Sequence, residues 1–250
     1  TENAILAAVS AKGKTIISNC AIEPEIQDMI VFLKKLGCNI NFVGKRKISI
    51  IGTKEFKSAT HDVIFDRIEL GTYLIAAALV GKKIIFLKIK PRIVETELKL
   101  LKKMGIKMKI DKNKIIVFES GKINSVNIKT ESYPGFPTDL QAQIMVLMLR
   151  ASGTSKITEN IFENRFMHVP ELRRMGAKII TKKNTAFVTG PIDLSGAEVM
   201  ATDLRASVSL VLAALTADNT TVINRVYHLD RGYENLEKKL KKCKANIKRI

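Results

Sequence analysis

The 250-residue sequence has no tryptophan, only 6% aromatic residues and only three cysteines. Cys20, Cys38 and Cys243 lie far apart, which argues against a disulfide framework and against a zinc site. We expect reduced thiols, buried as small hydrophobic side chains, and no metal site. No run approaches the roughly 20 apolar residues that cross a bilayer, and residues 1–3 lack the layout of a signal peptide. These absences predict a soluble, cytoplasmic protein with no membrane partner.

Acidic residues are scarce relative to basic ones, since 24 Asp and Glu stand against 42 Lys and Arg, a net charge of +18. Such an excess can neutralise the phosphates of a nucleic acid. Here the lysines are spread along the whole chain, aromatic residues are few, and no familiar nucleic-acid-binding motif is present. We therefore expect no nucleic-acid partner and keep a basic nucleic-acid-binding repeat protein as the less favoured alternative. A site for small anions fits the sequence better.

What the sequence does contain is a repeat. One phrase recurs about every 70 residues at the end of a helix-like segment, in residues 33–40, 101–108, 172–179 and 240–247. A second phrase keeps nearly the same interval, in residues 13–19, 81–87, 153–159 and 219–225. Because two independent markers recur together, we infer one supersecondary unit that is used four times. With 46% apolar residues, the chain can bury a core in one or two domains.

Hydrophobic periodicity orders the elements inside a repeat. The second repeat predicts a helix, a strand, a helix and two strands, at residues 66–80, 83–87, 93–104, 107–110 and 114–118. Gly81 ends the first of these helices. The same order fits residues 139–189 and, cut short after one final strand, residues 203–250. The predicted unit is α-β-α-β-β, or βαβαββ if a strand precedes the first helix.

Polar residues interrupt the pattern where helices are expected to begin. The first helix of each later repeat begins near an acid and the second near an arginine: Asp66, Asp139 and Asp203, then Arg92, Arg165 and Arg231. Any one of these acids is more often an N-cap than a catalytic group. If the repeats pack around a common axis, however, equivalent helix N-termini converge. Their free N–H groups and the arginines would then form a site for phosphate or carboxylate.

Four longer motifs carry a resemblance to a known family. They are residues 136–143 (FPTDLQAQ), 162–172 (FENRFMHVPEL), 201–207 (ATDLRAS) and 230–234 (DRGYE). These motifs resemble the UDP-N-acetylglucosamine 1-carboxyvinyltransferase (enolpyruvyl-UDP-GlcNAc synthase) family of enolpyruvyl transferases, and the resemblance extends over essentially the whole chain. The related enolpyruvyl transferase of the shikimate pathway shares the fold but is not similar in these motifs.

The resemblance implies an α/β fold of six βαβαββ units in two domains, each an inside-out, barrel-like arrangement of three units. About four of the six units are present here. The first residues resemble the inside of the third unit, so we expect an N-terminally truncated chain. Residues 1–65 would then be a partial unit of the first enolpyruvyl transferase domain, and residues 66–250 would form the second domain of three repeated units.

The family's reaction assigns roles to the matching residues. The 3-hydroxyl of UDP-N-acetylglucosamine attacks C2 of phosphoenolpyruvate while C3 is protonated, and phosphate then leaves, in the first committed step of peptidoglycan synthesis. Carried over by motif, Asp139 binds the hydroxyl and accepts its proton. The backbone at Ile161 and the side chain of Arg165 hold the nucleotide sugar. Arg205 and Arg231 hold phosphoenolpyruvate, with Asp203 near the reacting carbons. The further implied substrate contacts are Thr138, Asp66, Arg67 and Glu23, and no cofactor is implied.

The chain also departs from the family's pattern. The family's loop cysteine, a Lys-Asn pair and further substrate-holding arginines lie upstream of Thr1, and none of the three cysteines matches that loop. We therefore expect this chain by itself to be inactive. A degenerate, non-catalytic relative that binds anionic ligands is the alternative from another class. Selective binding of a uridine nucleotide sugar would favour the enzyme.

Overall fold

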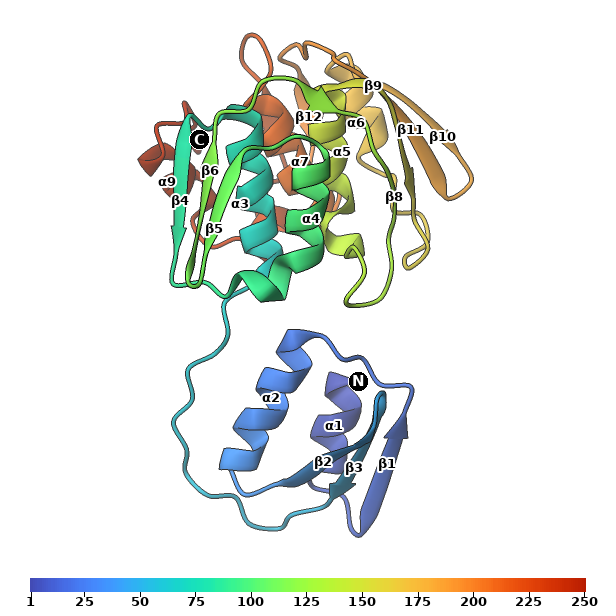
Figure 1. Ribbon diagram of the computed structural model, residues 1–250. Coiled ribbons are helices and arrows are strands. Elements are labelled where there is room, and N and C mark those ends of the chain that lie inside the picture. Colours follow the sequence, from blue (N-terminus) through green and yellow to red (C-terminus); the bar gives the residue numbers. More distant parts are fainter. The chain divides into compact units, whose positions relative to one another are not determined.

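The computed structural model describes all residues from Thr1 to Ile250, which form two compact units. The N-terminal unit comprises residues 1–65 with 132–134, and the C-terminal unit comprises residues 66–131 with 135–250. Figure 1 shows the helices and strands of each unit. No helix in either unit is both long enough and apolar enough to cross a membrane.

The N-terminal unit packs two helices on one antiparallel sheet of order β1-β3-β2 (Figure 1). Its elements are α1 (Glu2–Ala8), β1 (Lys14–Ser18), α2 (Pro24–Lys35), β2 (Asn39–Gly44) and β3 (Lys47–Ile51). Ile5 of α1, Ile26 of α2 and Ile48 and Ile50 of β3 are completely buried in one core. Because side chains alternate across a strand, the two buried isoleucines place one face of β3 on the helices.

The C-terminal unit contains three successive repeats. The first comprises α3 (Arg67–Val80), β4 (Lys83–Leu87), the 3-10 helix η1 (Pro91–Val94), α4 (Glu95–Lys103), β5 (Met108–Asp111) and β6 (Lys114–Phe118). The next comprises β7 (Ile123–Asn124), β8 (Asn127–Lys129), the 3-10 helix η2 (Thr138–Leu140), α5 (Gln141–Leu149), β9 (Ala151–Thr158), α6 (Val169–Arg174), β10 (Lys178–Lys182) and β11 (Thr185–Gly190). The last comprises β12 (Glu198–Met200), α7 (Leu204–Ala214), β13 (Val222–Asn224), α8 (Tyr227–Asp230) and α9 (Leu236–Lys242).

Helices α3, α5 and α7 contact one another in the interior of this unit, and the sheets lie outside them (Figure 1). Every residue of α5 is buried, and so are most residues of α3 and α7. A helix that is hydrophobic all round has no face to present to water, so it belongs in the interior. Strand β4, in contrast, alternates between exposed and partly buried residues, as expected for a sheet with one face in solvent. The predicted inside-out α/β fold class is confirmed.

Strand pairing confirms the repeat. In three sheets the first strand pairs with the third and the third with the second, as in β1-β3-β2, β4-β6-β5 and β9-β11-β10. Two of the repeats also contain the strand that precedes the first helix, because β8 pairs parallel with β9 and β12 pairs parallel with β13. The predicted strands at 83–87 and 114–118 coincide with β4 and β6, and the predicted helix at 66–80 is α3 with Asp66 as its N-cap.

Two local expectations are wrong. No strand follows α9. In the other repeats the second strand of the hairpin, such as β5 or β10, pairs with the third strand, whereas residues 243–250 pair with no strand of the structure. Cys243 is exposed, because it lies just after α9, beyond the buried Leu236 and Leu240. Cys20 and Cys38 are buried as expected, and all three thiols are free.

Candidate active site

Asp139 lies between two arginines from other segments of the chain. Arg165 Nη2 is 2.8 Å from Asp139 Oδ1, and Arg205 Nη2 is 3.2 Å from Asp139 Oδ2. The two arginine side chains are only 12% and 15% exposed, whereas the Asp139 side chain is 39% exposed. The carboxylate is therefore held by charged donors and stays accessible to a ligand. Arg165 lies in the loop before α6 and Arg205 in the first turn of α7, so two repeats must fold together to form this cluster.

The three aspartates at equivalent helix starts have different partners. Asp66 accepts two backbone N–H groups at the start of α3, at 2.7 and 3.0 Å. Asp203 accepts two at the start of α7, at 2.7 and 2.8 Å. These two carboxylates are N-caps. Asp139 lies in η2, and its side chain caps neither η2 nor α5. The expectation that Asp139 is an N-cap is wrong, because arginine side chains take the place of the backbone donors.

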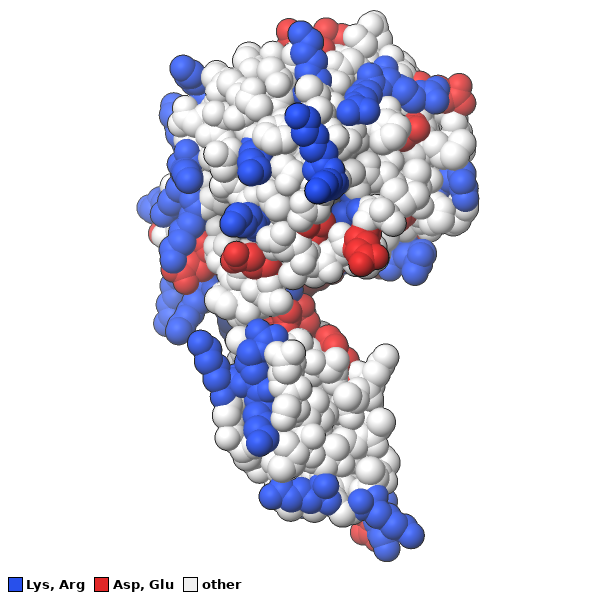
Figure 2. Space-filling model, turned by 90° about the vertical axis from the view of Figure 1, so that its right-hand side faces the viewer, with Lys and Arg blue, Asp and Glu red and all other residues white.

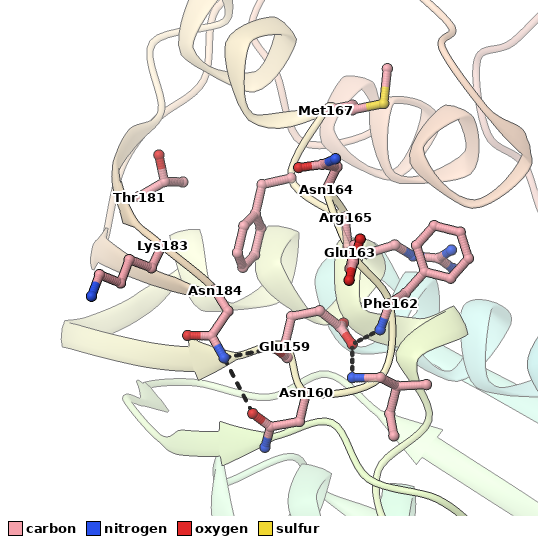
Figure 3. Close-up of a pocket in the computed structure, with 12 residues that line it drawn as sticks. Glu159, Asn160, Phe162, Glu163, Asn164, Arg165, Met167, Thr181, Lys183 and Asn184 are labelled. Atoms are coloured by element: carbon pink, nitrogen blue, oxygen red, sulfur yellow. Dashed lines mark hydrogen bonds between the residues drawn. The ribbon is translucent and has the colours of Figure 1, made fainter.

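Glu159 organises the loop that carries Arg165 (Figure 3). Its side chain is buried and accepts the backbone N–H groups of Ile161 at 2.9 Å and Phe162 at 3.0 Å. It also accepts the hydroxyl groups of Thr130 at 2.6 Å and Thr138 at 2.9 Å. Ile161 and Thr138 are predicted substrate contacts, and the N–H of the first and the hydroxyl of the second are bound to Glu159.

Sequence reasoning missed Glu159 as a functional residue, although a signal was present. The second repeat phrase ends in Glu159, whereas its other copies end in Asn19, Leu87 and Arg225. The repeat itself does not require an acid at this position, because the equivalent residues are an amide, an aliphatic side chain and a base.

An open cavity of about 810 Å³ lies between this loop and the β10–β11 hairpin. Figure 3 shows Thr181 and Lys183 of the hairpin on one side, and Phe162, Glu163 and Arg165 of the loop on the other. The Arg165 guanidinium carbon lies 4.9 Å from the centre of the Phe162 ring. The lining combines cationic, amide and apolar side chains, which suits a ligand with both polar and apolar parts.

A buried hydrogen-bond network binds the guanidinium of Arg205. The Tyr233 hydroxyl, in a residue that is 1% exposed, lies 3.3 Å from Arg205 Nη1 and 3.3 Å from Gln143 Nε2. It lies 2.9 Å from the hydroxyl of Thr72. Thr72, Gln143 and Arg205 belong to α3, α5 and α7, so the network joins the three central helices. Gln143 belongs to the polar stretch after Asp139, yet it is completely buried, and its hydrogen bonds in this network allow its burial.

Arg231 lies between α8 and α9 and is exposed. The next residue, Gly232, packs on Leu204 so closely that a Cβ atom built on it would come within 2.6 Å of Leu204 Cδ1. The segment from Arg231 to Tyr233 therefore lies against Leu204 at the start of α7, and a larger residue at position 232 would require the Leu204 side chain to move. Sequence reasoning placed Arg231 at the beginning of a helix, but it directly follows one, because α8 is a short separate helix.

Two predicted contacts remain, Arg67 and Glu23. Arg67 is the first residue of α3, directly after the N-cap Asp66. Glu23 precedes α2 in the N-terminal unit. Of the predicted site residues, Asp139, Arg165 and Arg205 are the ones that the structure joins by ion pairs.

His168 is completely buried at the start of α6. Burial lowers the pKa of its ring from 6.5 to about 4, although the nearby Asp203 carboxylate acts in the opposite direction. The ring is therefore uncharged at pH 7. It adds no positive charge to the loop that carries Arg165.

The excess of positive charge does not gather into one patch on the face shown in Figure 2. Lys and Arg side chains are scattered over that face and are separated by uncharged and acidic residues. Such spacing is typical of solvated faces, whereas a nucleic-acid interface gathers its cations along one stripe.

Comparison with known proteins shows to which family the chain belongs. The chain is 58% identical over its 250 residues to the UDP-N-acetylglucosamine 1-carboxyvinyltransferase of Pelagibacter ubique (strain HTCC1062) and 53% identical to that of Rickettsia prowazekii (strain Madrid E). Both matches cover all of this chain and 60% of the relative, so the chain spans less than two thirds of the length of these curated relatives.

Solved structures agree on the fold. The enolpyruvyl transferase NikO from Streptomyces tendae superimposes with a TM-score of 0.90 at 29% identity, over 99% of this chain and 59% of that one. An EPSP synthase from Acinetobacter baumannii superimposes with a TM-score of 0.71 at 16% identity, over 95% and 58% of the two chains. The sequence model of one family, EPSP synthase (3-phosphoshikimate 1-carboxyvinyltransferase), matches residues 1–240. The chain, with its βαβαββ repeats and its arginine-bound aspartate, belongs to this family.

Proposed function

We propose that this chain is part of a cytoplasmic enolpyruvyl transferase that acts on UDP-N-acetylglucosamine. The reaction transfers the enolpyruvyl group of phosphoenolpyruvate to the sugar's 3-hydroxyl and releases phosphate, as the first committed step of peptidoglycan synthesis. The observation that carries the proposal is the accessible Asp139 carboxylate held between Arg165 and Arg205. The reaction needs a base for a hydroxyl proton and cations for phosphate and carboxylate groups, and this cluster contains both.

The choice of acceptor rests on the motifs and on the relatives. The matching family model is named after a 3-phosphoshikimate enzyme. The curated relatives at 52–58% identity are instead named UDP-N-acetylglucosamine 1-carboxyvinyltransferase, and the four motifs resemble that group. The likeness to the Acinetobacter baumannii EPSP synthase, at 16% identity, concerns the fold alone. Both lines of support favour the nucleotide sugar over a shikimate.

In the proposed mechanism Asp139 accepts the hydroxyl proton as the sugar oxygen bonds to C2 of phosphoenolpyruvate and C3 gains a proton. The C2–O bond to phosphate then breaks and C3 loses a proton, which restores the double bond and releases phosphate. Arg205 and Arg231 bind the phosphate and carboxylate groups, and Arg165 binds the nucleotide sugar. Asp203, the N-cap of α7, lies two residues before Arg205. The arginines stabilise the charge that moves onto the leaving phosphate.

We also propose how the two units relate to the intact enzyme. Residues 1–65 correspond to a partial unit of the first enolpyruvyl transferase domain, and residues 66–250 to the second domain. Because the chain spans 60% of its curated relatives, the proposed activity belongs to the longer protein. We expect the chain by itself to be inactive.

The test uses the chain alone and the same chain completed to the length of its relatives with the remaining sequence of the Pelagibacter ubique protein, here termed the completed chain. Phosphate release is measured with phosphoenolpyruvate and either UDP-N-acetylglucosamine or shikimate 3-phosphate. We expect release by the completed chain with UDP-N-acetylglucosamine only. Release with shikimate 3-phosphate instead would reassign the acceptor. A folded completed chain that binds random DNA with steep salt dependence, and not the nucleotide sugar, would replace the enzyme by the nucleic-acid-binding alternative.

A further inference from the structure

Glu159 is a buried carboxylate whose oxygens accept hydrogen bonds from uncharged groups. Its residue is 4% exposed, and two backbone N–H groups and two hydroxyl groups donate to its oxygens at 2.6–3.0 Å. A buried carboxylate is costly unless its oxygens are hydrogen-bonded, so these donors determine where the group can be. Glu159 therefore has one well-defined position.

The donors come from three separate segments. Thr130 follows β8, Thr138 begins the turn η2, and Ile161 and Phe162 begin the loop before α6. The Thr130 hydroxyl also accepts the backbone N–H of Asn160 at 2.9 Å. One side chain thus joins a sheet, a turn and a loop that are distant in the sequence.

Two of these segments carry the charged pair of the site. Asp139 is the residue after Thr138, and Arg165 lies three residues after Phe162. Glu159 binds both segments within a few residues of the ion pair, whereas it does not contact Asp139 or Arg165 with its carboxylate. The length and direction of the 2.8 Å contact between Arg165 and Asp139 depend on how these two segments are held.

We infer that Glu159 is a positioning residue for the proposed enolpyruvyl transfer. It sets the Asp139 turn and the Arg165 loop relative to each other, so that the carboxylate faces the ligand while the guanidinium holds it. A misplacement of about 1 Å in such a group can cost roughly 100-fold in rate. The inference rests on the function proposed above.

Glu159→Gln is the first test, in the completed chain. The amide keeps the size of the side chain and one acceptor oxygen but loses the negative charge that strengthens all the hydrogen bonds. We expect kcat for phosphate release to fall at least 10-fold. Glu131→Gln, the same change at an exposed residue next to Thr130, serves as the matched control and should leave kcat within about 2-fold.

A double-mutant cycle separates positioning from a general structural role. If Glu159 acts through Asp139, Glu159→Gln should lower kcat by less than about 2-fold in the Asp139→Asn background. Equal losses in both backgrounds, or a Glu159→Gln variant that matches its parent, would overturn the inference. Failure of the completed parent to release phosphate would instead count against the proposed function.

Two further measurements keep the inference testable if Glu159→Gln does not fold or if the parent lacks turnover. Thr130→Val keeps the shape and removes one donor to Glu159, so kcat should fall about 3-fold, while Thr130→Ser should match the parent. In the chain as it stands, side-chain NMR should show a rotationally restricted Arg165 guanidinium in the parent and a freely rotating one in Glu159→Gln or Thr130→Val. An Arg165 guanidinium that is equally restricted in all variants would contradict the proposed positioning.

Discussion

At the scale of single residues, Asp139 differs from Asp66 and Asp203 in what binds its carboxylate. Backbone N–H groups hold the two capping aspartates at fixed points on α3 and α7. Side-chain guanidinium groups hold Asp139, and its side chain stays 39% exposed. A ligand hydroxyl can therefore reach Asp139 without uncapping a helix. This difference separates a structural acid from a candidate base.

We predict that Asp139→Asn in the completed chain lowers kcat by roughly 100-fold or more, because the amide cannot accept the hydroxyl proton. The fold should persist, since Asp139 caps no helix. Steady-state phosphate release with both substrates saturating provides the measurement, and circular dichroism checks the fold. Turnover within a few fold of the parent would remove Asp139 from the mechanism.

A second prediction concerns Arg231. Lysine keeps the charge but loses the planar fork that binds phosphate or carboxylate through two hydrogen bonds, so Arg231→Lys in the completed chain should lower kcat/KM for phosphoenolpyruvate by about 10-fold or more. The control must be an exposed arginine without such contacts, which excludes Arg173, because its guanidinium donates two hydrogen bonds to the Ile179 carbonyl. The exposed Arg174 is therefore the matched control. Equal kcat/KM for Arg231→Lys and Arg174→Lys would exclude Arg231 from the site.

At the scale of elements, the connection between β9 and α6 distinguishes this repeat from the others. In the repeat before it, three residues separate β4 from η1, whereas the segment between Thr158 and Val169 forms a longer loop. Glu159 holds the beginning of this loop and the buried His168 holds its end. A loop fixed at both ends can carry Arg165 to a defined place.

His168 gives this loop a measurable pH dependence. Its ring binds a proton near pH 6.5 in the unfolded chain and only near pH 4 in the folded protein, because burial disfavours the charged form. Between pH 4 and pH 6.5 the unfolded state therefore binds more protons than the folded state. The contribution of His168 to the free energy of unfolding is fully present above pH 6.5 and is lost as the pH falls towards 4. The expected slope is about 1.4 kcal/mol per pH unit.

Urea unfolding at a series of pH values from 7 to 4 checks this prediction, with His168→Gln as the comparison. Gln does not titrate. The free energy of unfolding should therefore change with pH less steeply in the variant than in the parent, and the difference between the two slopes should be the one given above. Parallel pH profiles for the two proteins would show that His168 is not the titrating group.

At the scale of the whole C-terminal unit, polar side chains join helices that are otherwise apolar. The Tyr233 hydroxyl bonds with Thr72 on α3, Gln143 on α5 and Arg205 on α7. Tyr233→Phe leaves these buried groups short of a partner, so we expect a loss of about 1–3 kcal/mol in the free energy of unfolding. Tyr227→Phe, at a residue that is 54% exposed, should change it by less than about 0.5 kcal/mol. Chemical denaturation of both variants measures the difference, and similar losses would contradict a network that supports the helices.

The repeat, the α-β-α-β-β order and most element positions could be predicted from the sequence, because hydrophobic periodicity and turn residues are local properties of the chain. Periodicity leaves open whether a strand precedes the first helix, and the family resemblance implies one. The same local signals failed after α9, because a strand forms only when it pairs with another strand, and residues 243–250 pair with none in the structure. They also placed Arg231 at the start of a helix, whereas it follows the four-residue helix α8 and precedes α9, because so short a helix leaves no clear periodicity in the sequence.

The sequence alone determined which residues are candidates for the site, through four motifs and the acids and arginines at equivalent positions in the repeats. Only the tertiary structure decided that Asp66 and Asp203 cap helices while Asp139 is bound by Arg165 and Arg205. It also revealed Glu159 and Tyr233 as the groups that hold this cluster in place. The physical reason is that a cap is made by neighbours in the chain, whereas an ion pair or a buried hydrogen bond between repeats depends on how distant segments pack together.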